Sequence, residues 1–331
     1  MDSRNRVHGS GQGRRYPGYM TEAPERTIVT SLTDLVEVVP SLLGFHASDS
    51  VVLLALQDGH VQLTARTDLG QAPEHALAAA WRRLPTAEFI LIAFTPDSGR
   101  AWAVLDEVGS ALPVRCGRIL VHADGERWFD HPDDVGTPYD ALGSVRLAEA
   151  AFAGRPVRRS RAELYRLVEP GRTPAAVTAS LERVAARELT LSDVVGEAWA
   201  LLAAHDDHPG ELDIDDATLL CLASHDPTFI DEAVLSTGRD NARARMSLWL
   251  QVVGATVPTC AGGALVAAGL AAWLAGDGAL QSVCLESLDG RRGPAGWAEF
   301  LDTVTRGVLP PGEWPAVRAA LRDQGGPTMP T

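Results

Sequence analysis

Polar side chains that could bind an anion gather beside the first apolar run of the sequence. The loop of residues 44–50 leads directly into VVLLAL (51–56), an uninterrupted apolar run typical of a strand covered on both faces. After an Asp-Gly turn, VQLTART (61–67) alternates apolar and polar residues, so the two runs predict a β-hairpin. The hairpin would return the end of its second strand to the loop. The candidate binding residues are His46, Asp49, Ser50, Arg66 and Asp68.

These residues also have a structural interpretation, which is the more common one for polar side chains in loops. The aspartate and serine of the loop would then hydrogen-bond nearby backbone groups. Alternation places Val61, Leu63 and Ala65 on one face of the second strand and Arg66 on the other. If a helix covers that other face, Arg66 is partly buried and must pair with the loop aspartate, Asp49, or with Asp68. Removing one partner of a buried pair typically costs about 3–5 kcal/mol.

A cluster of arginines occurs in the middle of the chain, in RPVRRSR (155–161). Guanidinium groups bind phosphate or carboxylate oxygens in pairs, so the cluster could hold a phosphate or the acidic face of a partner. The same arginines could equally pair with the surplus carboxylates of this chain. The sequence leaves both interpretations open. The candidate residues are Arg155, Arg158, Arg159 and Arg161.

A third cluster combines histidines and carboxylates in HDDHPGE (205–211), and further aspartates follow it. Imidazole and carboxylate groups at this density could hold a divalent cation. However, histidines before a Pro-Gly pair also mark the end of a helix, and aspartate is a favoured N-cap for the next one. We therefore predict no metal site, and keep only His205 and His208 as weak candidate ligands.

The composition excludes several classes of enzyme. All 29 basic residues are arginine, so the chain has no lysine. Schiff-base enzymes, pyridoxal-phosphate enzymes, protein kinases and P-loop NTPases all depend on a lysine amine. The sequence also lacks the G-x-S-x-G, H-E-x-x-H and G-x-G-x-x-G motifs. No cofactor is predicted.

The charge and the cysteines indicate the compartment and the class of partner. A net charge of −14 and a pI of about 5.0 argue against binding to nucleic acids or to anionic membranes, which need basic surfaces. The four cysteines form no C-x-x-C pair, which favours reduced thiols. The uncharged segment 246–276 contains Pro258 and many glycines and alanines, so it predicts two buried helices rather than a membrane span. We expect a soluble cytoplasmic protein.

The order of these patterns predicts an α/β (α+β) fold in two folded parts. Residues 27–154 alternate helix and strand patterns, which predicts a mixed sheet of about five strands with covering helices. The runs at 51–56 and 89–94 are apolar throughout, so they should be neighbours at the centre of the sheet. Residues 155–325 contain only helix patterns and predict an all-α domain of helical hairpins. The ends of the chain are expected to be disordered tails, 1–26 and 326–331.

Several segments resemble the signatures of one known family. LLGF (42–45), DSVV (49–52) and ARTDL (65–69) resemble the opening signature of an uncharacterised actinobacterial family, the domain of unknown function 4192. AAWLAGDGAL (271–280) resembles the C-terminal signature of the same family. Ala47 departs from the pattern, because proline is expected there, and this loosens a turn. The resemblance implies a cytoplasmic actinobacterial protein and no assigned activity.

These features together favour a non-catalytic interaction or regulatory protein. Its partner would be another protein or a second copy of the chain, because the catalytic motifs are missing and the alanine-rich helical part could offer grooves. The alternative is an enzyme that acts on a small polar or phosphorylated substrate between the Gly44–Ser50 loop and the Arg155–Arg161 junction. An enzyme would hold a histidine or carboxylate with a perturbed pKa in a concave pocket.

Overall fold

The computed structural model describes residues 31–323, apart from short gaps within that range. The gaps are residues 59, 71–79, 113–116, 153–156, 170, 289–290, 292 and 308. The expectations for the tails 1–26 and 326–331 therefore lie outside the described residues, as do Arg155 and Cys116. Of a helix that the sequence pattern suggests before Pro85, only residues 80–83 are described, and these four are helical.

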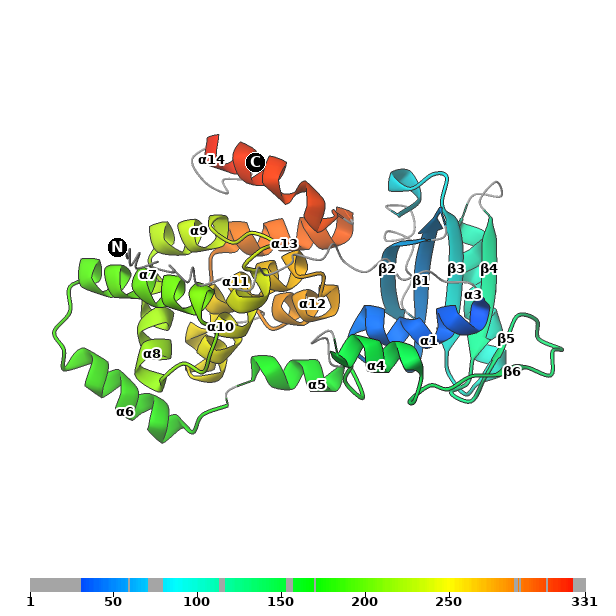
Figure 1. Ribbon diagram of the computed structural model, residues 1–331, viewed down its shortest axis with the longest axis horizontal. Helices are drawn as coiled ribbons and strands as arrows, with labels where there is room; N and C mark the ends of the chain where they lie inside the picture. The colour runs from blue at the N-terminus through cyan, green and yellow to red at the C-terminus, as the bar shows by residue number, and fades with distance from the viewer. Residues whose placement is uncertain are drawn as a thin grey trace, which may run out of the picture.

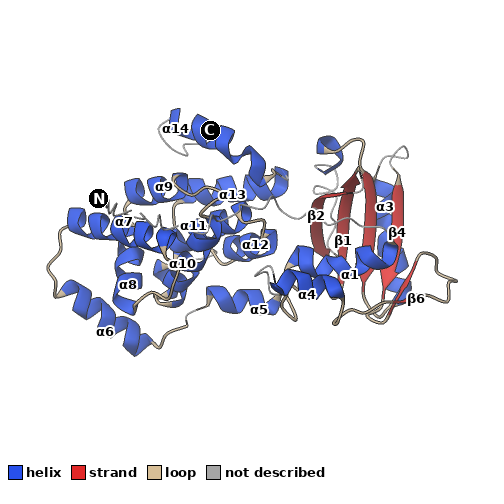
Figure 2. Ribbon diagram, in the orientation of Figure 1, coloured by secondary structure: helices blue, strands red, loops and turns tan. Residues whose placement is uncertain are grey.

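The molecule has a sheet at one end and a packed group of helices at the other (Figures 1 and 2). Helix α1 lies across one face of the sheet, and α4 and α5 lie between the sheet and the other helices (Figure 1). The fold is therefore α+β, with a mixed sheet near the N-terminus and a helical C-terminal part, as predicted. The boundary near residue 154 between two separate domains stays a prediction.

The sheet contains six strands in the order β2-β1-β3-β4-β5-β6. β1 and β3 are antiparallel neighbours flanked on both sides, which confirms the central position predicted for the two apolar runs. β3 and β4 are parallel, and helix α3 (Ser98–Ala111) connects them. The sixth strand is only two residues long. The strands are β1 Ser50–Gln57, β2 His60–Asp68, β3 Glu88–Phe94, β4 Arg118–Ala123, β5 Arg127–Phe129 and β6 Thr137–Pro138.

A β-bulge in the hairpin corrects one detail of the predicted pattern. The register between β1 and β2 shifts between Ala55 and Leu56. Beyond the shift the side chains change faces, so Val61 packs with the cluster on the α1 side, whereas Leu63 packs on the α3 side. The prediction that Val61 shares a face with Leu63 was wrong, because strict alternation holds only without a bulge.

Helices lie on both faces of the sheet and also form the C-terminal part of the molecule. Helix α1 (Leu32–Leu43) covers one face of the sheet and α3 covers the other. The remaining helices are α4 Val145–Phe152, α5 Ala162–Tyr165, α6 Pro174–Ala185, α7 Leu191–Asp207, α8 Ile214–Ala223, α9 Pro227–Leu235, α10 Ala242–Gly254, α11 Gly262–Leu274, α12 Gly278–Glu286, α13 Ala295–Gly307 and α14 Trp314–Asp323. One-turn 3-10 helices occupy Arg166–Val168, Pro258–Cys260 and Pro311–Glu313.

Helix α11 forms the centre of the helical part. All of its residues are buried, and α9, α10, α12 and α13 pack around it. This confirms that the second half of the uncharged segment, Gly262–Leu274, packs inside the helical part. No described helix is both long enough and apolar enough to cross a membrane. Among the described cysteines, Cys221 and Cys284 are buried, Cys260 is half-buried, and all three are free.

Candidate functional site

Two of the segments singled out in the sequence meet at the junction between the sheet and the helices. Gly44 ends α1 in the left-handed conformation, with φ 75°, and turns the chain toward Phe45. Phe45 forms an isolated parallel bridge with Arg158. The Arg158 N–H donates to the Gly44 carbonyl at 2.8 Å, and the His46 N–H donates to the Arg158 carbonyl at 3.0 Å. The loop and the arginine segment are therefore held together by backbone hydrogen bonds.

The aspartate and serine of the loop contribute to its structure. Asp49 adopts a left-handed conformation, with φ 43°, which is tolerated by aspartate. Its carboxylate accepts a hydrogen bond from the Thr95 hydroxyl at 3.1 Å, and its carbonyl accepts from the Leu69 N–H at 2.9 Å. Ser50 is fully buried, but its hydroxyl makes no hydrogen bond with another described residue. The contacts of Asp49 connect the loop to the end of β3 and to the end of β2, so the structural interpretation holds for Asp49, whereas the hydrogen bond expected of Ser50 is not formed.

Arg66 pairs with Asp68 and stacks on the loop. Its guanidinium lies 2.5 Å from the Asp68 carboxylate and 5.8 Å from the centre of the Phe45 ring. The Arg66 side chain is 14% exposed, whereas that of Asp68 is 49% exposed. Because Asp49 is engaged by Thr95, the carboxylate that neutralises Arg66 is Asp68. Helix α1 covers this face of the sheet, and the partly buried arginine is paired as the pattern predicts.

Arg66→Ala should lower the free energy of unfolding by about 1–2 kcal/mol, less than for a fully buried pair, because water screens the exposed Asp68. For a chain of this size, the melting temperature should fall by about 2–6 °C. Arg159→Ala is the control, since Arg159 is exposed and should change stability by less than about 0.5 kcal/mol. Equal effects of the two substitutions in thermal denaturation would show that Arg66 behaves as a surface residue.

Arg161 connects the junction to the helical part. Its guanidinium donates to Glu286 of α12 at 2.6 Å and to the Tyr165 hydroxyl at 3.0 Å. The Tyr165 hydroxyl also donates to Glu286. Burial raises the pKa of Tyr165, and the hydrogen bond to Glu286 raises it further. Arg161 is therefore paired with a carboxylate of its own chain, as the structural interpretation of the arginine cluster proposes.

Arg158 and Arg159 differ from Arg161, because neither makes an ion pair with another described residue. The charge of Arg158 acts on Asp277, at the start of α12. Burial raises the pKa of Asp277 more than the Leu280 N–H and Arg158 lower it. Next to these arginines, His46 is half-buried, and burial lowers its pKa. At neutral pH the imidazole is therefore uncharged, and the positive charge of this surface comes from the arginines.

Helix α4 exposes apolar side chains beside the junction. Val145 and Phe152 are 72% and 97% exposed, and Leu142, just before the helix, is 78% exposed. On the other side of the helix, Ala150 is buried, and α4 packs against α1. Figure 1 shows α4 running alongside α1 toward the junction. The sequence analysis missed these residues, although the spacing of seven between Val145 and Phe152 places these two on one helical face.

The histidine and carboxylate cluster at the end of α7 has a structural role in the described residues. Asp206 accepts two hydrogen bonds from Arg245 of α10, both at 2.6 Å. His205 is buried near Asp206 and Arg245, and burial lowers its pKa. His208 is exposed and ends the helix. Within the part of the chain that the structure describes, no group of three or more His, Cys, Asp or Glu side chains could hold a metal ion.

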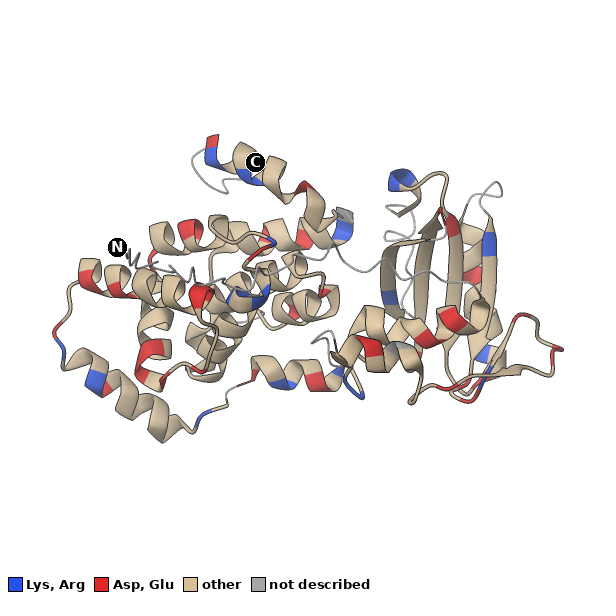
Figure 3. Cartoon of the chain, in the orientation of Figure 1, with Lys and Arg blue, Asp and Glu red and all other residues tan. Residues whose placement is uncertain are grey.

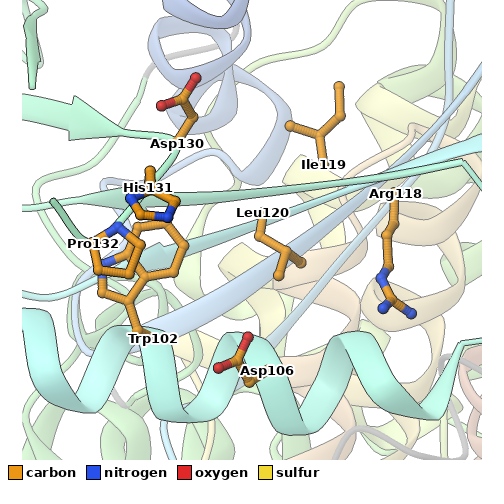
Figure 4. Close-up of a pocket in the computed structure, with 8 residues that line it drawn as sticks. All are labelled: Trp102, Asp106, Arg118, Ile119, Leu120, Asp130, His131 and Pro132. Atoms are coloured by element: carbon orange, nitrogen blue, oxygen red, sulfur yellow. The ribbon is translucent and has the colours of Figure 1, made fainter. Parts of the chain in front are cut away.

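An open depression lies elsewhere, on the α3 side of the sheet. Its volume is about 500 Å³, and Figure 4 shows side chains from α3, from β4 and from the segment after β5 around it. None of the residues predicted for the candidate site lines it. The lining residues are Trp102, Asp106, Arg118, Ile119, Leu120, Asp130, His131 and Pro132.

Comparison with known families agrees with the resemblance seen in the sequence. The family model described as Domain of unknown function (DUF4192) matches residues 33–311, which is most of the chain. The chain belongs to this family. No curated protein and no solved structure matches this DUF4192 protein.

The segments that resemble the family signatures converge in this DUF4192 protein at the junction. Phe45 of the first segment pairs with Arg158 and lies under Arg66 of the third. Asp277 of the C-terminal segment is close enough to Arg158 to feel its charge. Residues far apart in the sequence therefore build one region, where the sheet and the helical part meet.

Proposed function

We propose that this DUF4192 protein is an interaction protein that binds another protein through one surface at the junction. This junction surface consists of Leu142, Val145, Phe152, Arg158 and Arg159. The observation that carries the proposal is the exposure of Phe152, which is 97%. A phenylalanine on a helix whose opposite side is already packed has no structural reason to face water.

The apolar part of the surface supplies the driving force for binding. Full burial of a phenylalanine or valine side chain contributes about 1.5–3 kcal/mol, and aromatic side chains are frequent centres of protein interfaces. Val145 shares the exposed face of α4 with Phe152, and Leu142 is exposed just before the helix. Large exposed apolar side chains gathered in one region typically mark a protein-binding surface.

The charged part of the surface indicates the chemistry of the partner. Arg158 and Arg159 follow α4 closely in the chain, and the backbone bonds of Arg158 hold this segment at the junction. Figure 3 shows how acidic residues are spread along the rest of the chain, whose net charge is −14. A partner with carboxylates beside an apolar segment complements this surface, because the arginines would then acquire the ion pairs that they lack within the described chain.

Site-specific photocrosslinking tests the proposal. Benzoylphenylalanine at position 152, expressed in the native host, should crosslink to one defined protein, and the crosslinked peptide should be apolar and acidic. The control position is Leu191, which is 62% exposed at the start of α7. Arg158→Glu combined with Arg159→Glu should abolish the crosslink at 152. Identical crosslinking at 152 and 191, or none at 152, would contradict the proposal.

A further inference from the structure

Two cysteines that are distant in the sequence meet at one small pocket in the helical part. Cys221 lies on α8, and Cys260 ends the one-turn helix Pro258–Cys260. We infer that this pair is a peroxide-sensitive site, at which Cys221 and Cys260 join in a reversible disulfide bond. The pair shares no residue with the junction surface, so the inference does not depend on the proposed function.

The contacts of Cys221 place its sulfur beside Cys260. The Cys221 Sγ lies 3.7 Å from the Cys260 carbonyl oxygen and 3.0 Å from the hydroxyl of Thr256, which precedes the one-turn helix. Burial raises the pKa of Cys221 and the charge of Cys260 raises it further, so the two thiols are close enough to interact. Because the carbonyl oxygen is two covalent bonds from the Cys260 Cα, a small movement of the Cys260 turn brings the sulfurs within bonding reach.

The pocket gives a small oxidant access to the pair. Its volume is about 70 Å³, whereas a cavity needs only about 10–15 Å³ to hold one water molecule, and hydrogen peroxide is little larger than water. The rim is open to solvent, since Leu222 and Val257 are 39% and 40% exposed. Among the described residues, no carboxylate and no arginine lines the pocket, which suits a neutral oxidant such as a peroxide.

The two thiols are suited to different steps. Cys260 is half-buried, whereas Cys221 is only 5% exposed. Burial raises the pKa of Cys221 to about 11, so this thiol stays protonated at neutral pH. Peroxides oxidise accessible thiolates. The exposed member of the pair, Cys260, therefore reacts with the peroxide, and Cys221 resolves the product.

The reaction consumes one peroxide and forms one disulfide. The Cys260 thiolate attacks a peroxide oxygen, so that an S–O bond forms and the O–O bond breaks. The leaving hydroxide takes up the proton that Cys260 released, which gives water and a sulfenic acid. The Cys221 sulfur then attacks the Cys260 sulfur and the S–O bond breaks. The second hydroxide leaves with the Cys221 proton as water. The two thiols are oxidised, and the peroxide is reduced to two water molecules.

The disulfide would join parts of the helical region that are otherwise held by packing. It would tie α8 to the connection between α10 and α11, because Cys260 lies in that connection. The bond would cross the pocket that separates the two thiols from solvent. Cellular thiols would reduce it again by exchange, so the state of the pair would follow the balance between peroxide and reductant.

Peptide mapping of the full chain after peroxide treatment tests the inference. The folded protein is treated with an equimolar amount of hydrogen peroxide, and N-ethylmaleimide then blocks the free thiols. Trypsin and chymotrypsin together separate Cys260 from Cys284, because Trp273 lies between them. The major oxidised product should be a Cys221 peptide linked to a Cys260 peptide, and dithiothreitol should separate the two. Cys284 is fully buried and should stay reduced.

Single variants test the order of the two steps. In Cys221→Ala, Cys260 should stop at the sulfenic acid, which dimedone traps as a stable adduct. In Cys260→Ala, oxidation of Cys221 should be slower than in the wild type by about tenfold, because the buried thiol is protonated. Equal rates of Cys221 oxidation in Cys260→Ala and in the wild type would contradict this order.

The same treatment in guanidinium chloride is the control for chance pairing, because an unfolded chain should give a mixture of cysteine pairs. No linked peptide from the folded protein, or the same mixture of pairs as from the unfolded chain, would overturn the inference. Accumulation of the Cys260 sulfenic acid in the wild type, with Cys221 left as a free thiol, would overturn it as well.

Discussion

Replacing Asp206 with alanine should lower the free energy of unfolding by about 3–5 kcal/mol. Asp206 accepts hydrogen bonds from Nε and Nη2 of Arg245, both at 2.6 Å, and from the Asn241 amide at 3.3 Å. The Arg245 side chain is only 5% exposed, so without Asp206 its charge would be buried and uncompensated. Chemical denaturation measures the effect.

The neighbouring aspartate provides a matched control. Asp207 is exposed at the C-terminal end of α7, and Asp207→Ala should change stability by less than about 0.5 kcal/mol. Removing both partners, in Asp206→Leu combined with Arg245→Leu, should recover much of the loss, because no unpaired charge then stays buried. A loss of under 1 kcal/mol in Asp206→Ala would contradict the pairing that joins α7 to α10.

Gly263→Ala should also destabilise the protein, by about 1–3 kcal/mol. A Cβ atom at position 263 would lie 2.7 Å from the Ser224 carbonyl oxygen and 2.9 Å from the Ser224 Cβ. Backbone atoms cannot move away cheaply, so α11 would shift from the turn that follows α8. This cost exceeds the gain in helix propensity from glycine to alanine, which is at most about 1 kcal/mol.

Gly196 is the matched control for this substitution. It lies inside α7, and nothing is within 4 Å of the position that its Cβ would occupy. Gly196→Ala should therefore stabilise the protein by about 0.5–1 kcal/mol. If thermal denaturation shows the same sign for both substitutions, close packing of α11 against Ser224 is not what determines the result.

The architecture was predictable because its main elements have strong local signals. The short apolar runs of β1 and β3, bounded by turn residues, are typical of covered strands, and they are central neighbours. Most helices begin at side chains that can cap them, such as Thr190 with Asp193, or Asp226 before Pro227. Apolar runs and capping residues lie next to each other in the sequence, so they can be recognised without knowing any contact between distant residues.

Other features depend on contacts between distant residues. The bulge at Ala55 and Leu56 changes the face of Val61, and the two-residue strand β6 is too short to leave a pattern. The bridge between Phe45 and Arg158 and the pairing of Asp206 with Arg245 join distant segments. Sequence periodicity describes one element at a time and does not determine such pairs.

The candidate site was predictable only in part, because some of its contacts join residues that are distant in the sequence. Alternation placed Arg66 on a covered face, and Asp68 two residues away was an obvious partner. The choice between Asp49 and Asp68 required the position of Thr95, which follows β3. The exposure of Phe152 depends on which side of α4 packs against α1, and the sequence of α4 is apolar on both sides.

The affinity of the crosslinked partner for purified variants tests the central claim most directly. Val145→Ser combined with Phe152→Ser should raise the dissociation constant by about 10–100-fold, as expected for the loss of a central aromatic contact. Leu191→Ser removes an exposed apolar side chain elsewhere and should leave the dissociation constant unchanged. All three proteins should melt at nearly the same temperature, because these side chains face water. Wild-type affinity in the variant that lacks Val145 and Phe152 would contradict the account.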